Sequence, residues 1–89
     1  MSEGGLTAEQ LRGITFEKPP LGKRGYDEKA VGDFLALAAR RLDGRGHLSA
    51  DEVRGMRFNK PKFGRRGYDA AQVDALIGEI ADAIAGLDG

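Results

Sequence analysis

The sequence predicts an all-α fold built from two tandem repeats, each a short helix, a loop and a longer helix, packed about a pseudo-two-fold axis. Three observations predict it. First, the chain matches itself after a shift of 42 residues: 6–45 lies on 48–87 without a gap, and 15 of these 40 positions are identical. Second, each copy carries two helix-start signals. Third, the second helical segment of each copy has apolar residues spaced for one helix face.

The repeat divides the chain into four segments. We expect a flexible N-terminus at 1–5, a first repeat at 6–43, a joint at 44–47 and a second repeat at 48–88. Glycines around the joint end one helix and let the chain turn. A unit of about 40 residues rarely buries enough surface to be stable alone. Each repeat therefore needs a partner, either its sister repeat within a monomer or a second chain in a homodimer.

Both short helices are predicted to begin at a capping box. Thr7 is followed three residues later by Gln10, and Ser49 is followed at the same distance by Glu52. In such a box the hydroxyl accepts a hydrogen bond from an early backbone N–H, and the Gln or Glu accepts one from the cap's own N–H. A glycine six residues after each cap is expected to end the helix.

The longer helices are predicted to start at two aspartate caps, Asp27 and Asp69. The expected apolar face of the first helix comprises Val31, Phe34, Leu35, Ala38 and Leu42. That of the second comprises Val73, Leu76, Ile77, Ile80, Ile84 and Leu87. Neither repeat has another surface large enough to cover its own long helix, so each long helix is expected to pack on its sister.

Two features of these helices are left open by the pattern. Gly32 and Gly78 lie in the helix interiors, where each costs about 1 kcal/mol relative to alanine. They are either tolerated in a stable bundle or required for close approach of two helix backbones. The long helices can also run parallel, with both loops at one end, or antiparallel.

A basic loop joins the helices of each repeat, at 16–27 and 58–69. The segment 16–24 has a net charge of +2 and 58–66 has +4, and each carries an apolar residue at its tip. The predicted site consists of these tips and basic neighbours, namely Leu21, Lys23, Arg24, Lys62, Phe63, Arg65 and Arg66. The alternatives are that the tips fold back onto the core and that the basic residues form a solvated rim.

The order of elements in each copy resembles the amino-terminal domain of the DivIVA family. The first copy has Leu6-Thr7, Phe16, Gly25-Tyr26-Asp27, Val31 and Phe34-Leu35. The second copy has Leu48-Ser49, Phe58, Gly67-Tyr68-Asp69, Val73 and Leu76-Ile77. The resemblance covers nearly all of both repeats.

The resemblance implies a non-catalytic module that attaches peripherally to a membrane or serves a scaffold. In that family the domain attaches a cytoplasmic scaffold to the inner face of the bacterial membrane, at poles and division septa. By position, Leu21 and Phe63 would enter the lipid, and Arg24 and Arg66 beside them would meet the headgroups. The alternative is a protein–protein adaptor that keeps the fold without binding lipid.

Composition argues against other classes of function. The chain has no cysteine, one histidine (His47) and no recognisable nucleophile, phosphate loop or metal-ligand set, so we expect no enzyme activity, cofactor or metal. The formal net charge is zero and no helix carries a basic stripe, so nucleic acid is not the expected partner. The expected partner is an anionic membrane surface or a protein. Without a signal-peptide pattern or a spanning segment, we expect a cytoplasmic location.

The neutral total hides a separation of charge. From residue 69 onward the chain has five acidic residues and no basic one, and these are Asp69, Asp74, Glu79, Asp82 and Asp88. At helical spacing Asp69, Asp74, Glu79 and Asp82 are expected to form a solvated or salt-bridged face. If the long helices run parallel, the two basic loops are expected to form one surface with apolar tips.

Overall fold

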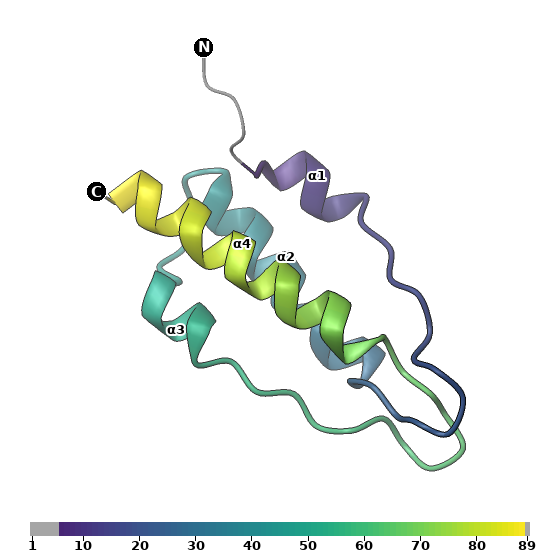
Figure 1. Ribbon diagram of the computed structural model, residues 1–89. Helices are drawn as coiled ribbons and strands as arrows, with labels where there is room; N and C mark the ends of the chain where they lie inside the picture. Colours follow the sequence, from purple (N-terminus) through teal and green to yellow (C-terminus); the bar gives the residue numbers. More distant parts are fainter. Residues whose placement is uncertain (1–5, 89) are drawn as a thin grey trace.

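The structure, a computed structural model, describes residues 6–88 and contains four helices and no strand in that range (Figure 1). The helices are α1 (Ala8–Arg12), α2 (Glu28–Leu42), α3 (Ala50–Arg54) and α4 (Ala70–Asp88). The predicted all-α class is therefore confirmed. The flexible N-terminus predicted at 1–5 lies outside the described residues.

The helix starts are held by the capping groups that the sequence predicts. Thr7 Oγ1 accepts the Gln10 N–H at 3.1 Å, and Gln10 Oε1 accepts the Thr7 N–H at 2.9 Å. In α3, Ser49 Oγ accepts the Glu52 N–H at 3.0 Å, and Glu52 Oε1 accepts the Ser49 N–H at 2.8 Å. Asp27 caps α2 by accepting the N–H three residues on at 2.9 Å. Each cap satisfies donors that a helix leaves unpaired at its start.

The core lies between the two long helices, and each short helix covers one of them. α1 packs on α2, α3 packs on α4, and α2 packs on α4. One cluster of buried side chains joins all four helices, with Phe34 of α2 and Ile80 and Ile84 of α4 among its largest members. Phe16 and Phe58, which precede the loops, are partly buried against this cluster.

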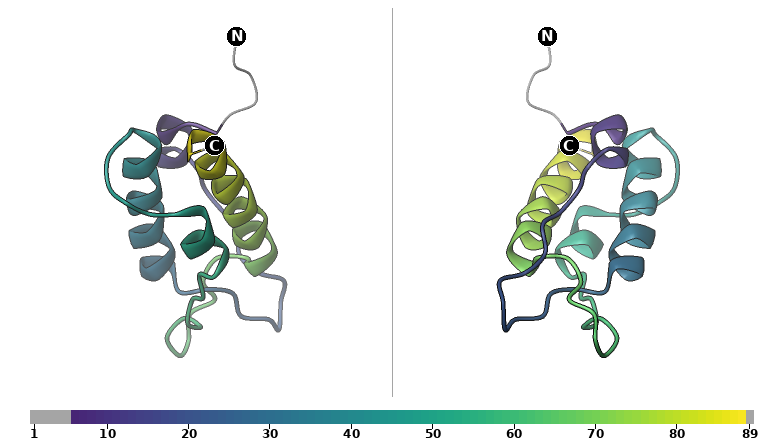
Figure 2. Two further views of the ribbon diagram at one scale, coloured as in Figure 1. Left: turned by 90° about the vertical axis from the view of Figure 1, so that its left-hand side faces the viewer. Right: turned by 90° about the vertical axis from the view of Figure 1, so that its right-hand side faces the viewer.

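The long helices run in the same direction, so both loops lie at one end of the molecule (Figures 1 and 2). Tyr26 and Tyr68, just before α2 and α4, form an antiparallel β-bridge. At the other end, Arg41 near the end of α2 forms an ion pair with Asp88 at the end of α4. Contacts at both ends of the helix pair thus fix the parallel arrangement, which the sequence left open.

One expectation about the long helices is wrong, and one question that the sequence left open is decided. Leu87 was placed on the apolar face of α4 but is 57% exposed, because the last turn of the helix extends past the cluster that buries Ile84. A Cβ added at Gly32 or Gly78 would meet no atom within 4 Å apart from the local helix backbone. Neither glycine therefore serves a close approach of helix backbones, and both are tolerated on open faces.

Contacts between the two halves of the chain occur in pairs that differ by a shift of 42 residues. The Asp27 N–H donates to the Asn59 carbonyl at 3.0 Å, and the Asp69 N–H donates to the Glu17 carbonyl at 2.9 Å. The same relation holds for the aromatic contacts, which join Phe16 to Tyr68 at 5.0 Å and Tyr26 to Phe58 at 5.3 Å between ring centroids. Each loop is therefore held largely by the opposite half of the chain.

Candidate functional site

Each loop turns at a glycine that directly follows the apolar tip residue. The Lys23 N–H donates to the Pro20 carbonyl at 3.0 Å, with Gly22 at a φ of +82° between them. In the second loop the Arg65 N–H donates to the Lys62 carbonyl at 3.0 Å, and Gly64 has a φ of +85°. Positive φ at the third residue is typical of a type II turn and suits glycine. The turn holds the second residue, the apolar tip, away from the protein.

The tips are the most exposed large apolar side chains among the described residues. Leu21 is 88% exposed and Phe63 is 99% exposed. The alternative in which they fold back onto the core is therefore wrong. An apolar side chain exposed to this extent loses the benefit of burial, about 1.5–3 kcal/mol for a Leu or Phe. Such a side chain can recover that free energy only against another surface.

Arg24 and Arg66 have a role that the sequence did not indicate. The Arg24 guanidinium donates to the Pro61 carbonyl, and the Arg66 guanidinium donates to the Pro19 carbonyl. Both acceptor prolines are buried, and each belongs to the opposite loop. The two arginines thus fasten the loops to each other. Contact of these two residues with headgroups stays a prediction.

Three of the predicted basic residues lie exposed at the loop tips, outside any ion pair of the described residues. Lys23, Lys62 and Arg65 are exposed and form no ion pair within residues 6–88. Lys18, in contrast, lies 3.9 Å from the Glu28 carboxylate. The available positive charge therefore surrounds Phe63 more densely than Leu21.

The glycines of the two Gly-Tyr-Asp motifs allow the loops to meet. A Cβ on Gly25 would lie 1.7 Å from the Tyr68 carbonyl oxygen, and one on Gly67 would lie 2.3 Å from that of Tyr26. Tyr26 and Tyr68 exchange backbone hydrogen bonds of 3.0 Å in both directions at this point. The repeated motif was a signal for these residues, but sequence alone did not show that its glycines face the other copy.

The Tyr26 side chain adds a contact that has no counterpart in the other half. Its hydroxyl donates to Asp74 Oδ1 at 2.8 Å. This hydrogen bond, with some burial and the negative charge of Asp74, raises the pKa of Tyr26 above its usual value. The position 42 residues before Asp74 is Gly32, so Tyr68 has no equivalent acceptor. The two halves are therefore similar but not equivalent.

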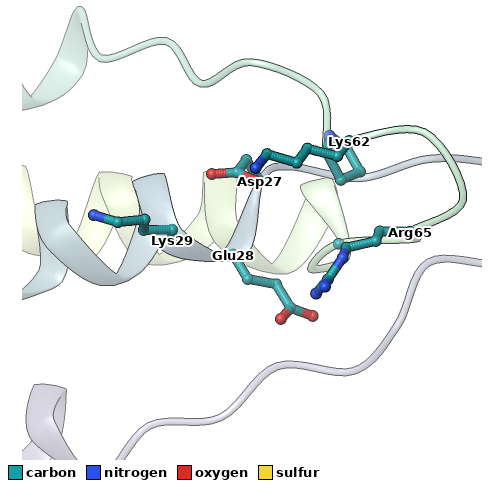
Figure 3. Close-up of a pocket in the computed structure, with 7 residues that line it drawn as sticks. Asp27, Glu28, Lys29, Lys62 and Arg65 are labelled. Carbon is teal, nitrogen blue, oxygen red and sulfur yellow. The ribbon is translucent and has the colours of Figure 1, made fainter.

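A hollow of about 300 Å³ lies between the start of α2 and the second loop (Figure 3). Its charged lining residues are Asp27, Glu28, Lys29, Lys62 and Arg65. In Figure 3 the Lys62 side chain extends towards Asp27, and the Arg65 guanidinium lies near Glu28. Both signs of charge are present, so the hollow lacks the single-sign field that would select an anion or a cation.

The two loops diverge as they leave the end of the helix pair. Figure 2 shows their tips on opposite sides below the starts of α2 and α4. They share one end of the molecule, but each tip faces outward from its own side. No helix in the described range 6–88 is both long enough and apolar enough to cross a membrane.

The chain thus combines a helical core with outward apolar tips on two basic loops. Comparison with known proteins gives a partial match to the cell wall synthesis protein Wag31, a protein of the DivIVA family. The Wag31 proteins of Mycobacterium tuberculosis, Mycobacterium leprae and Mycolicibacterium smegmatis are each 46% identical to this chain over 37 residues. The match covers 42% of this chain and 14% of each Wag31 protein.

The match has the length of one repeat, since 37 residues compare with the 40 that align between the two copies. It supports the relation to the DivIVA family that the sequence motifs indicated. No family model matches the chain, and no solved structure matches it. With 14% of each Wag31 protein covered, the chain spans only a small part of the length of the relatives it matches.

Proposed function

We propose that this chain is a non-catalytic, DivIVA-like module that attaches peripherally to the anionic inner face of a bacterial membrane, at division or polar sites. The observation that carries this proposal is the exposure of the two loop tips, 88% for Leu21 and 99% for Phe63. Both tips lie at one end of the molecule (Figure 2). The partial likeness to a cell wall synthesis protein supports a role at sites of wall growth or division.

We further propose that the chain is an internal pseudo-dimer, in which the two repeats are related by an approximate two-fold axis along α2 and α4. The paired contacts of Tyr26 with Tyr68, and of each loop arginine with a proline of the other loop, support this relation. Such an axis is compatible with parallel long helices and places both loops at one end. A monomer of this kind has the pairing that a homodimer would otherwise supply.

The forces that would hold the module at a membrane follow from the free loop residues. Burial of Leu21 and Phe63 in the acyl region supplies about 1.5–3 kcal/mol each. Lys23, Lys62 and Arg65 add about 1 kcal/mol each near an anionic leaflet. No single contribution is large, so attachment would need both tips and would weaken as salt screens the basic residues.

Sedimentation with vesicles tests the proposal directly. The full chain should sediment with vesicles that contain phosphatidylserine or phosphatidylglycerol, and much less with vesicles of phosphatidylcholine alone. The double variant Leu21→Ser, Phe63→Ser should bind at least about tenfold more weakly for each tip removed. Leu87→Ser is the matched control, because Leu87 is also exposed but lies at the opposite end of the helix pair.

The runner-up function is a protein–protein adaptor that keeps the fold without lipid affinity. The free apolar tips would then enter pockets of a protein partner, as exposed aromatic anchors commonly do. Equal vesicle binding by the wild-type chain and the double tip variant would remove the membrane proposal. Binding to a purified protein but to no vesicle would favour the adaptor.

A further inference from the structure

A hollow beside α4 has an apolar floor and an acidic rim. Its volume is about 440 Å³, and it lies where the segment after α1 passes the side of α4. Ile14, Phe16 and Leu76 contribute the apolar lining, while Glu17 and Glu79 line it with carboxylates. Both glutamates are exposed, and neither forms an ion pair within residues 6–88. The hollow therefore presents unneutralised negative charge around an apolar surface.

The two carboxylates of this hollow, Glu17 from the first repeat and Glu79 from the second, have no counterpart at the equivalent positions. At the positions 42 residues away, Glu17 corresponds to Asn59 and Glu79 corresponds to Leu37. Position 57, which corresponds to Thr15 of the hollow, is an arginine. The equivalent surface beside α2 thus lacks both of these carboxylates and carries Arg57, while its own carboxylate, Asp33, replaces Ala75 and is paired with Lys29.

The loop tips differ between the halves in the opposite sense. The first tip, Leu21, follows Pro20 and precedes Gly22 and Lys23, so it has a basic residue on one side only. In the second loop the corresponding residues are Lys62, Phe63 and Arg65, so the larger apolar tip has a basic residue on each side. One half has therefore acquired an aromatic tip with flanking positive charge, and one side of the molecule has an apolar hollow with flanking negative charge.

We propose that the second loop tip of one copy docks into this hollow of another copy, with Phe63 against Ile14, Phe16 and Leu76. Lys62 and Arg65 then face Glu17 and Glu79 across the contact. An apolar cavity of about 150 Å³ already holds a benzene ring, so a hollow of about 440 Å³ has room for the Phe63 ring. Complementary charge favours this hollow, because the equivalent surface has Asn59 and Leu37 in place of Glu17 and Glu79, and its carboxylate, Asp33, is already paired with Lys29.

The two surfaces are different patches of one chain, so the contact is heterologous. Each copy has one donor tip and one acceptor hollow, and successive copies join head to tail into a linear chain or a ring. Docking occupies Phe63 and leaves Leu21 free. The assembly goes beyond the proposed function and does not depend on vesicle binding.

Sedimentation velocity of the full chain without lipid tests the proposal. Wild-type protein should form dimers and larger species as its concentration rises towards about 1 mM, and these species should dissociate as salt is raised. Phe63→Ser and Glu79→Lys should each weaken association by at least about tenfold. The matched changes in the other half, Leu21→Ser and Leu37→Lys, should leave association unchanged.

Mixing the two defective variants is the decisive measurement. Phe63→Ser keeps an intact hollow, and Glu79→Lys keeps an intact tip, so an equimolar mixture should form a 1:1 dimer and nothing larger. All four variants change exposed residues, so circular dichroism should show that each remains folded. A wild-type chain that stays monomeric at about 1 mM, or a mixture without the dimer, would overturn the proposal.

Vesicle binding distinguishes this proposal from the proposed function. Glu79→Lys retains both loop tips, so it should sediment with anionic vesicles at least as well as the wild type does. If Glu79→Lys loses association in solution but keeps vesicle binding, the hollow serves association and is not required for membrane attachment. Loss of vesicle binding in the tip variants, with association intact in all variants, would support membrane attachment and overturn docking.

Discussion

Replacing Gly25 with alanine should break the bridge that joins the two loops. The added Cβ would lie 1.7 Å from the Tyr68 carbonyl oxygen, whereas such contacts are essentially never below 3.0 Å. The two bridged backbone segments must therefore separate by about 1.3 Å, the difference between these two distances. The reciprocal hydrogen bonds between Tyr26 and Tyr68 are now 3.0 Å long, so a separation of this size removes both.

The cost of this separation can be built from its parts. Two lost backbone hydrogen bonds contribute about 1 kcal/mol each, and partly buried groups left without partners add roughly 1–3 kcal/mol. The Gly25→Ala variant should therefore lose about 3–5 kcal/mol, a large share of the roughly 5–15 kcal/mol that stabilises a typical domain. Its thermal midpoint should fall by at least about 12 °C.

The assay is urea unfolding followed by circular dichroism, with Gly32→Ala as the matched control. Gly32 lies inside α2, where an added Cβ meets no atom within 4 Å outside the local helix backbone, so alanine there should stabilise the protein by about 1 kcal/mol. The same chemical change thus has opposite signs at the two glycines. A Gly25→Ala variant within about 0.5 kcal/mol of wild type would refute the argument that the bridge holds the loops.

Three further predictions follow from contacts between the halves. The hydrogen bond to Asp74 raises the pKa of Tyr26, so this contact should stabilise the fold fully below about pH 10. The stabilisation should be lost as the pH rises through the folded-state pKa of Tyr26. Urea unfolding between about pH 8 and 11.5 should therefore show a steeper fall in the free energy of unfolding for wild type than for Tyr26→Phe. Arg66→Gln should speed amide hydrogen exchange in the first loop, whose Pro19 carbonyl it binds, and an effect confined to the second loop would contradict this. Cleaving the chain at Gly44 should leave two unfolded halves that regain helicity on mixing, and a stable monomer from either half would contradict the required pairing.

The elements that could be predicted from sequence are those whose cause lies within a few residues. Thr7 and Ser49 cap their helices because a hydroxyl and a Gln or Glu three residues later meet whenever a helix starts there. The apolar faces of α2 and α4 follow the helical period for the same local reason. The burial of Leu87 was predicted wrongly, since periodicity gives the apolar face of a helix but does not show where the element covering that face ends.

The parts of the site that escaped prediction depend on residues far apart in the chain. Arg24 binds a carbonyl 37 residues away, and nothing in its immediate sequence separates that role from contact with solvent or a headgroup. Likewise, the local sequence indicates only that Gly25 lies in a turn, and its close contact with Tyr68 depends on the packing of the two repeats. The exposure of Phe63 depended on whether its turn faced the core, which a sequence pattern cannot decide.

A fused pair of repeats can diverge in ways that a homodimer cannot. In a symmetric homodimer each substitution appears on both sides, so a new acidic residue and a new basic residue alter both copies at once. In one chain, Asp74 can accept the Tyr26 hydroxyl while the equivalent position remains Gly32. In the same way, the position equivalent to Glu79 in the first repeat is occupied by Leu37. Within the proposed pseudo-dimer, fusion preserves the shared core while each half acquires its own surface, and the charge differences between the halves are the places where separate roles should be sought.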